Sequence, residues 1–126
     1  GRWADWVGSV EEREDAVAPV IAWMLAATFS DPPSPPGASA PGEALPPLSH
    51  WAAFHPDAPM QALGRDGHPV REEAGFLPPV PLERRMWAGG RVLLHAPVRV
   101  GERLKRRSEI LKVSEKSGGA GDMVFV

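Results

Sequence analysis

A pair of arginines beside two large apolar side chains is the part of this sequence best suited to bind a ligand. Arg84 and Arg85 are followed directly by Met86 and Trp87. A guanidinium fits a phosphate or carboxylate through two parallel hydrogen bonds, and tryptophan offers a broad apolar surface. On a strand, adjacent arginines face opposite sides, so one can serve the structure while the other meets a ligand. Met86, Trp87 and Trp51 are all large apolar side chains. Two interpretations are open for them, lining an apolar tunnel and ordinary packing in the core.

Further cations follow in the same half of the chain, at Lys105, Arg106 and Arg107. Residues 1–83 carry four Arg or Lys against twelve Asp or Glu, whereas residues 84–126 carry ten against four. The plainer interpretation is that the two halves pair with each other or with another subunit. The sharper one is a phosphate-binding surface for an anion such as coenzyme A. A pI near 6.1 argues against a nucleic-acid partner.

Size and composition fit a small protein with a real core. The chain has 126 residues, 43% hydrophobic content and no cysteine, which excludes disulfides and thiolate chemistry. The longest apolar run, residues 17–29, is interrupted by Pro19 and is too short to cross a bilayer. No signal peptide is visible at the start. We therefore expect a soluble, cytoplasmic protein.

One helix is predicted near the N-terminus. Residues 3–10 suggest a short strand or turn, and the acidic residues 11–15 with Pro19 suggest a helix start. Residues 20–29 (VIAWMLAATF) are apolar on nearly every side, so this helix should be enclosed by other elements. An enclosed helix of about three turns, wrapped by an antiparallel sheet, is what a hot-dog fold requires.

The middle of the chain is rich in loops. Residues 30–47 contain seven prolines and form either a lid or a plain surface loop. Residues 48–54 suggest a short helix or strand, and Asp66-Gly67 a tight turn. Strands are predicted over residues 92–95, 104–114 and 123–126, with a turn at 117–122. Because Val126 falls inside an apolar strand, we expect a fragment or a split subunit.

Three stretches carry a family resemblance over nearly the whole chain. They are residues 45–54 (LPPLSHWAAF), 63–69 (LGRDGHP) and 75–110 (GFLPPVPLERRMWAGGRVLLHAPVRVGERLKRRSEI). Their order and spacing resemble the N-terminal half of the two-domain MaoC-like dehydratases. The resemblance implies an α+β hot-dog fold over residues 1–126, as one half of a double hot dog. It also implies a hydro-lyase acting on acyl-CoA thioesters without a cofactor, assembled as a dimer or another homo-oligomer.

The catalytic pattern of that family is missing from this chain. MaoC-type hydratases place an Asp and a His about five residues apart on a loop entering the central helix, as general acid and base. Asp66 and His68 are two residues apart in a turn, and His50, His55 and His95 are better explained by packing or capping. The alternative to packing for His50 and His55 is that they line the acyl pocket. We expect no catalytic residue and no metal site here.

The resemblance therefore implies that the catalytic Asp and His come from a second hot-dog domain or subunit. This chain would complete the double hot dog and shape the acyl pocket, with Trp51, Arg84, Arg85 and Trp87 contacting the substrate. The alternative is a hot-dog module without catalytic activity, which binds acyl-CoA or serves only in dimerisation.

Overall fold

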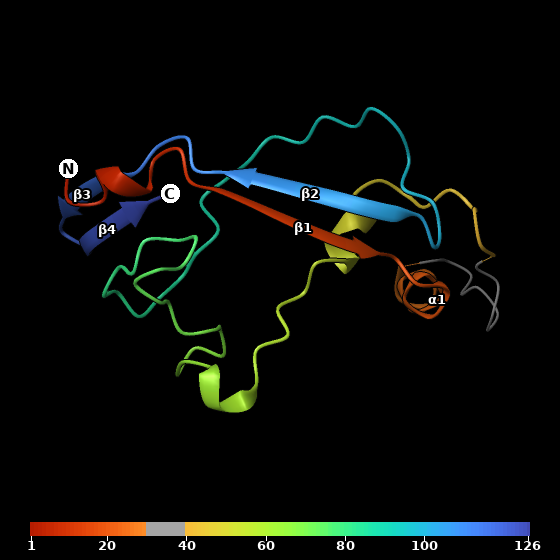
Figure 1. The fold of residues 1–126 in the computed structure, drawn as a ribbon, viewed down its shortest axis with the longest axis horizontal. Coiled ribbons are helices and arrows are strands. Elements are labelled where there is room, and N and C mark those ends of the chain that lie inside the picture. The colour runs from red at the N-terminus through yellow and green to blue at the C-terminus, as the bar shows by residue number, and fades with distance from the viewer. Residues whose placement is uncertain (30–39) are drawn as a thin grey trace. The chain divides into compact units, whose positions relative to one another are not determined.

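The structure is a computed structural model that describes residues 1–29 and 40–126. Its regular elements are, in chain order, η1 (Ala4–Trp6), β1 (Val10–Ala16), α1 (Pro19–Phe29), η2 (Ser49–Ala52), η3 (Met60–Ala62), β2 (Arg103–Glu109), β3 (Ser114–Gly118) and β4 (Gly121–Phe125) (Figure 1). Antiparallel strands with a single α-helix confirm the predicted α+β class and are consistent with a hot-dog fold. None of the helices in the described ranges is long and apolar enough to cross a membrane.

The chain divides into two compact units, and each has its own buried side chains. Unit 1 comprises Gly1–Glu12, Pro56–Gly89 and Arg106–Val126. Unit 2 comprises Arg13–His55 and Gly90–Lys105. The first two strands contribute residues to both units, and β3 and β4 belong to unit 1.

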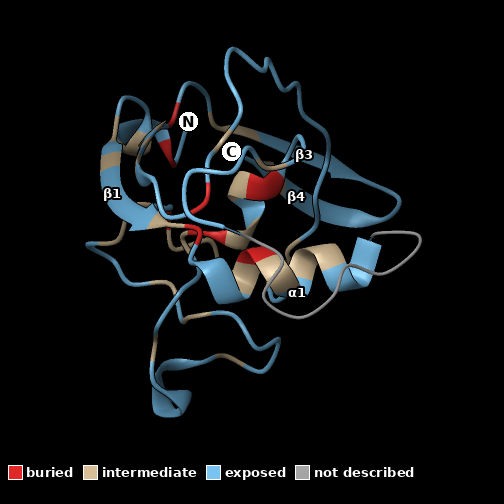
Figure 2. Cartoon of the chain, turned by 90° about the vertical axis from the view of Figure 1, so that its right-hand side faces the viewer, coloured by how far each residue is buried: buried red, intermediate tan, exposed pale blue. Residues whose placement is uncertain are grey.

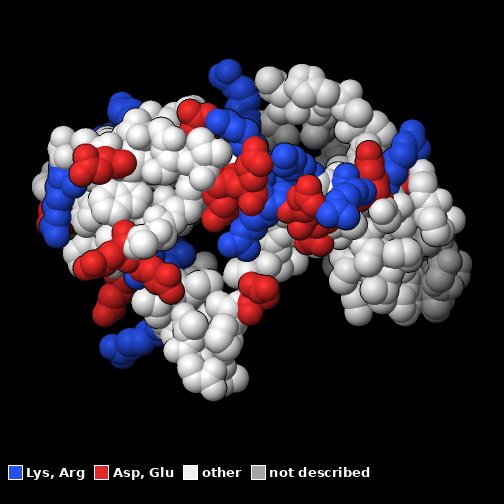
Figure 3. Space-filling view, in the orientation of Figure 1, with Lys and Arg blue, Asp and Glu red and all other residues white. Residues whose placement is uncertain are grey.

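Opposite charges join β1 and β2, which pair as a two-stranded sheet. Arg106 Nη2 lies 3.0 Å from Glu11 Oε1, and Arg103 pairs with Glu14. The residue numbers rise from Glu11 to Glu14 along β1, whereas those of their partners fall from Arg106 to Arg103 along β2. The two strands are therefore antiparallel. Figure 3 shows acidic and basic side chains intermingled here. At these two ion pairs, the acidic first half of the chain pairs with the basic second half, as the plainer interpretation of the charge asymmetry predicts.

The prediction that residues 11–15 begin a helix is wrong, because they lie in β1. Acidic residues before an apolar run are typical of a helix start, but these carboxylates face arginines on a neighbouring strand. Pairing with β2 overrides the local preference. The helix itself begins at Pro19, as predicted, where proline lacks only an N–H that would have no partner within the helix.

The expectation that α1 is enclosed is also wrong for this chain. Only Ala22 is buried, whereas Val20 is 51% exposed, Met24 55% and Phe29 81% (Figure 2). The physical reason is that the helix is apolar on every side, but the described residues of unit 2 pack against one side of it. The strands found after residue 91 are β2, β3 and β4, and the predicted strand over residues 92–95 is not among them.

The core of unit 2 is formed by Val17, Ala22, Ala53 and Val100, with partly buried hydrophobic neighbours packed against it. Those neighbours are Ile21, Leu45, Phe54, Val98 and Leu104. This small core fixes one side of α1, the end of η2 and the segment around residue 100 against one another. The sequence left helix and strand open for residues 48–54. The structure shows the 3-10 helix η2 in this segment and no strand.

The predicted strand over residues 92–95 is absent. Val92, Leu93 and Leu94 are 47%, 71% and 56% exposed, and no strand among the described residues pairs with them. A strand needs hydrogen bonds from a neighbour, and apolar composition alone does not supply one. The chain becomes paired again only at residues 98–100.

Residues 98–100 form backbone hydrogen bonds with the end of the predicted proline-rich loop. Leu45 N–H donates to Val98 O at 2.8 Å, and Val100 N–H donates to Glu43 O at 2.9 Å. Residues 30–39 of that loop lie outside the described residues, so the choice between a lid and a plain surface loop stays a prediction for them. Residues 40–47 form no regular element apart from an isolated bridge between Ala44 and Arg99.

Unit 1 contains the β3–β4 hairpin, whose register pairs Ser114 with Phe125 and Gly118 with Gly121. This confirms the predicted turn within residues 117–122 and the strand near the C-terminus. The predicted strand over residues 104–114 is present as β2 only up to Glu109, and residues 110–113 belong to no strand. Ile110 is 4% exposed and exchanges backbone hydrogen bonds with Gly8 and Ser9.

Candidate functional site

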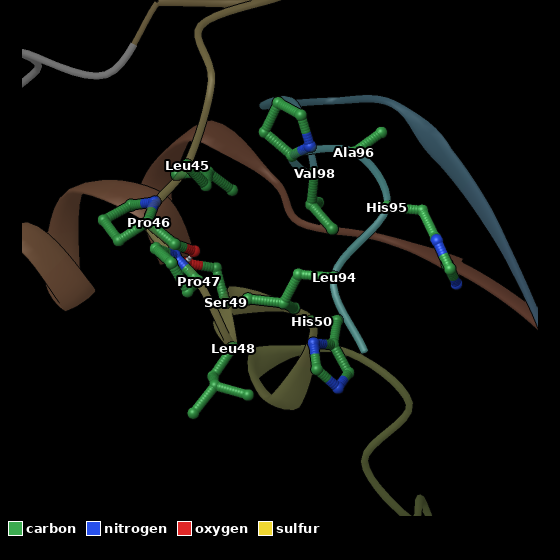
Figure 4. Close-up of a pocket in the computed structure, with 11 residues that line it drawn as sticks. Leu45, Pro46, Pro47, Leu48, Ser49, His50, Leu94, His95, Ala96 and Val98 are labelled. Carbon is green, nitrogen blue, oxygen red and sulfur yellow. Dashed lines mark hydrogen bonds between the residues drawn. The ribbon is translucent and has the colours of Figure 1, made fainter. Parts of the chain in front are cut away.

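An apolar pocket of about 280 Å³ lies in unit 2. Two segments line it: Leu45, Pro46, Pro47, Leu48, Ser49 and His50 from one side, and Leu94, His95, Ala96, Pro97 and Val98 from the other. Hydrogen bonds position both walls, since Leu45 N–H donates to Val98 O and Ser49 Oγ donates to Pro46 O at 2.6 Å. Figure 4 shows Leu94 reaching toward Ser49, whereas the ring of His95 is turned away. The pocket suits an apolar group.

Trp51 is adjacent to this pocket in sequence but does not line it. Its side chain is 59% exposed, and its ring lies 5.8 Å from the ring of His50. Trp51 therefore does not pack in the core, and its contact with the substrate stays a prediction. His50 lines the pocket and is half-buried, whereas His55 is exposed.

A larger cleft of about 830 Å³ lies in unit 1, between residues 64–71 and 79–86. Its lining includes the predicted Arg84 and Arg85, together with Met86. Trp87 is 80% exposed and lies outside the lining. The structure thus brings the two predicted arginines to one cleft, and neither of the predicted tryptophans lines this cleft or the pocket of unit 2.

Two arginines tie the walls of this cleft to each other. Arg71 Nη1 donates to Val80 O at 2.5 Å and to Leu82 O at 3.0 Å. From the opposite wall, Arg85 Nη2 donates to Pro69 O at 2.8 Å. Burial first, and then the positive charge of Arg85, lower the pKa of Arg71 from its ordinary value. Both guanidinium groups line this cleft.

Asp66 and His68 form the predicted tight turn at one side of the cleft. The backbone N–H of His68 donates to Asp66 Oδ1 at 3.1 Å, and His68 Nδ1 lies 3.2 Å from Oδ2. The backbone hydrogen bond is the main cause that lowers the pKa of Asp66. Gly67 has a φ of 79°, a left-handed conformation that glycine adopts without strain. This geometry agrees with a turn role for both residues.

Asp15 is the acidic side chain closest before α1, and its oxygens already accept backbone hydrogen bonds. Oδ2 accepts from Phe54 N–H at 2.7 Å and Oδ1 from Ala16 N–H at 2.8 Å. These two bonds, that from Phe54 first, lower the pKa of the carboxyl. Asp15 therefore serves the structure of unit 2.

Lys105, Arg106 and Arg107 are not among the residues that line the cleft of unit 1. Arg106 is paired with Glu11 and Arg107 with Glu109, at 3.0 and 2.8 Å. Lys105 belongs to unit 2, whereas Arg84 and Arg85 belong to unit 1. Within the described ranges, no group of three His, Cys, Asp or Glu could hold a metal ion.

Sequence reasoning missed Arg71, which the structure places in the cleft beside Arg85. A single arginine before two glutamates carries no recognisable motif. Its contacts are backbone carbonyls nine and eleven residues further along the chain. No signal in the sequence could have found it.

Comparison with known proteins gives two matches. The family model for hydroxyacyl-thioester dehydratase type 2 matches residues 48–126. A mesaconyl-C(4)-CoA hydratase of Chloroflexus aurantiacus is 43% identical over 124 residues, which are 98% of this chain and 42% of that protein. The chain thus spans less than half the length of this relative. These matches show that the chain belongs to the family of type 2 hydroxyacyl-thioester dehydratases.

Proposed function

We propose that this chain is the N-terminal hot-dog domain of a longer enzyme that adds water to, or removes it from, acyl-CoA thioesters. The observation that carries the proposal is the 43% identity to the Chloroflexus hydratase over 98% of the chain. Because the chain corresponds to only 42% of that protein, we assign catalysis to a second hot-dog domain or subunit.

The side chains of the described residues support this division of labour. Reversible hydration of a 2-enoyl thioester needs a general base for water, an acid for the α-carbon and donors for the enolate oxygen. Asp15, which precedes α1, is engaged by two backbone N–H groups, and Asp66 and His68 bond each other in a turn. Neither arrangement resembles an Asp and a His converging on a substrate at the start of a helix.

The contribution of this chain would be to bind and orient the substrate. In unit 2, the pocket beside His50 and Leu94 suits an apolar part of the substrate. In unit 1, Arg84 and Arg85 supply positive charge. Trp51 in unit 2 and Trp87 in unit 1 are both exposed, and each is available to contact the substrate from its own unit.

The name of the relative also indicates a substrate class. Mesaconyl-C(4)-CoA is the thioester of a dicarboxylic acid, in which one carboxyl is joined to coenzyme A and the other is free. We propose a substrate of this kind, a 2-enoyl thioester with a second carboxylate. Such an acyl group needs apolar walls for its carbon skeleton and a cation for its free end.

The test is an assay of the full-length protein with mesaconyl-C(4)-CoA, followed by the loss of the conjugated enoyl absorbance. Hydration is expected, and replacing the Asp and His of the second domain should abolish it. A protein that binds acyl-CoA tightly without turnover would instead be the non-catalytic module, and the proposed activity would be refuted.

A further inference from the structure

The cleft of unit 1 has an excess of positive charge. Its lining contains four arginines, at positions 65, 71, 84 and 85, against two acidic residues, Asp66 and Glu83. The Asp66 carboxylate is already engaged by the backbone N–H of His68 and by its ring. The cleft therefore attracts anions, although the chain as a whole carries a net charge of −2.

Arg71 and Arg85 each retain donors for a ligand. A guanidinium has five N–H donors, and in Arg71 the two on Nη1 are directed to the carbonyls of Val80 and Leu82. In Arg85, Nη2 donates to Pro69 O, whereas the buried Nε has no hydrogen-bond partner. Nε forms an ion pair with Asp66 Oδ2 at 4.0 Å, a distance too long for a hydrogen bond. The backbone contacts hold both groups in place, so a ligand would find them ordered.

Arg71 and Arg85 carry like charges that line the same cleft. The charge of Arg85 is the second cause, after burial, of the lowered pKa of Arg71. An anion bound between two like charges offsets their repulsion, and a carboxylate can accept two parallel N–H bonds from one guanidinium.

The remaining walls of the cleft are largely apolar. Pro69, Val70, Pro79, Val80, Pro81, Leu82 and Met86 contribute to the lining. A phosphate, which keeps its hydration, gains little from such walls. A short hydrocarbon chain that ends in a carboxylate matches both the apolar walls and the arginines.

We propose that this cleft binds the free carboxylate of the acyl group, with Arg85 and Arg71 as its ligands. The inference rests on the proposed function and adds the residues that select dicarboxylic over monocarboxylic thioesters. The same positive charge could attract a phosphate of coenzyme A, and the experiment separates these two sources.

The experiment compares full-length wild type with Arg85→Gln, which removes the charge but keeps an amide that can donate to Pro69. Each protein is assayed with mesaconyl-C(4)-CoA, with crotonyl-CoA, which lacks the second carboxylate, and with the pantetheine thioester of mesaconate, which lacks the nucleotide phosphates. Arg2→Gln, a substitution in the same unit outside the cleft, is the control. Melting temperature is measured for every variant.

We expect Arg85→Gln to lower kcat/KM about 10- to 100-fold for both mesaconyl thioesters, mainly through KM, as for loss of a charged hydrogen bond. Its effect on crotonyl-CoA should be small. Arg85→Lys should recover part of the loss, since it restores charge without the planar fork. Arg2→Gln should leave all three substrates unchanged.

Three results would overturn the inference. A loss shared by both CoA thioesters and absent for the pantetheine thioester would assign the cleft to phosphate. An equal loss on all substrates with a lower melting temperature would make Arg85 purely structural. A wild type that hydrates crotonyl-CoA as well as mesaconyl-C(4)-CoA would refute the carboxylate site while the hydratase assignment stood. Failure of the wild type on every thioester would instead refute the proposed function.

Discussion

Asp15 accepts a hydrogen bond from the backbone N–H of Phe54, 39 residues further along the chain, at 2.7 Å. Phe54 is one of two described non-glycine residues with a positive φ, 62°, a conformation that costs free energy for a side chain with a β-carbon. The bond holds this turn against the end of β1, next to the core residue Ala53. Asp15 is therefore a structural anchor of unit 2.

Replacing Asp15 with Ala should lower the melting temperature, because the Phe54 and Ala16 N–H groups lose their acceptor. Asp15→Asn should have a smaller effect, since one oxygen remains. Asp5→Ala is the matched control, on an exposed carboxylate. Equal melting temperatures for Asp15→Ala and Asp5→Ala would contradict the anchoring role.

The stabilisation by Asp15 should depend on pH with a defined sign. Its pKa is lowered from the ordinary 3.8 in the folded chain, chiefly by the Phe54 N–H. A carboxyl with a depressed folded pKa stabilises above its unfolded pKa and loses that contribution as pH falls through the folded value. The difference in melting temperature between wild type and Asp15→Ala should be complete at neutral pH and shrink below pH 3.8. A difference that grows in acid would be the wrong sign.

Gly67→Ala should destabilise the chain by about 1 kcal/mol, because a β-carbon is disfavoured in the left-handed region. Gly67 has a φ of 79° and no atom within 4 Å of a built β-carbon, so the cost is conformational rather than steric. Gly119→Ala provides the control, at another site without a close neighbour and with an ordinary φ. Urea unfolding of both variants measures the difference, which should vanish if the turn at Asp66 is unimportant.

On α1, Ala22→Asp should unfold unit 2, whereas Met24→Asp should be tolerated. Ala22 is 1% exposed in the core, so its replacement buries an unpaired carboxylate at a cost of several kcal/mol. Met24 is 55% exposed, and the new carboxylate would remain hydrated. Circular dichroism and thermal melts of the isolated chain decide this. Equal damage from both substitutions would mean that α1 is enclosed after all.

The isolated 126-residue chain is expected not to hydrate crotonyl-CoA, itaconyl-CoA or mesaconyl-CoA. The reason is that its Asp15, Asp66 and His68 serve turns and backbone contacts. The assay should include the full-length protein as a positive control. Robust turnover by the purified chain would refute the assignment of catalysis to a second domain, and Asp66→Ala with His68→Ala would be the first variants to examine.

The sequence by itself determined the features that depend on neighbouring residues. Pro19 restricts its own φ and marks the start of α1, and Asp66-Gly67 forms a turn through bonds within a few residues. The hairpin turn between β3 and β4 is similarly local. The adjacent Arg84 and Arg85 were recognisable as a possible ligand site from their chemistry alone, and both line one cleft.

Only the tertiary structure decided the features that depend on distant partners. Residues 11–15 became part of a strand because arginines 89 and 95 residues further along the chain face Glu14 and Glu11. Residues 92–95 have the composition of a strand but no neighbouring strand among the described residues, and α1 has more apolar surface than the described part of its unit covers. Arg71 joined the cleft through contacts with backbone carbonyls, which every residue type provides equally. Propensity and charge pattern act along the chain, whereas pairing and burial require a partner whose position the fold alone sets.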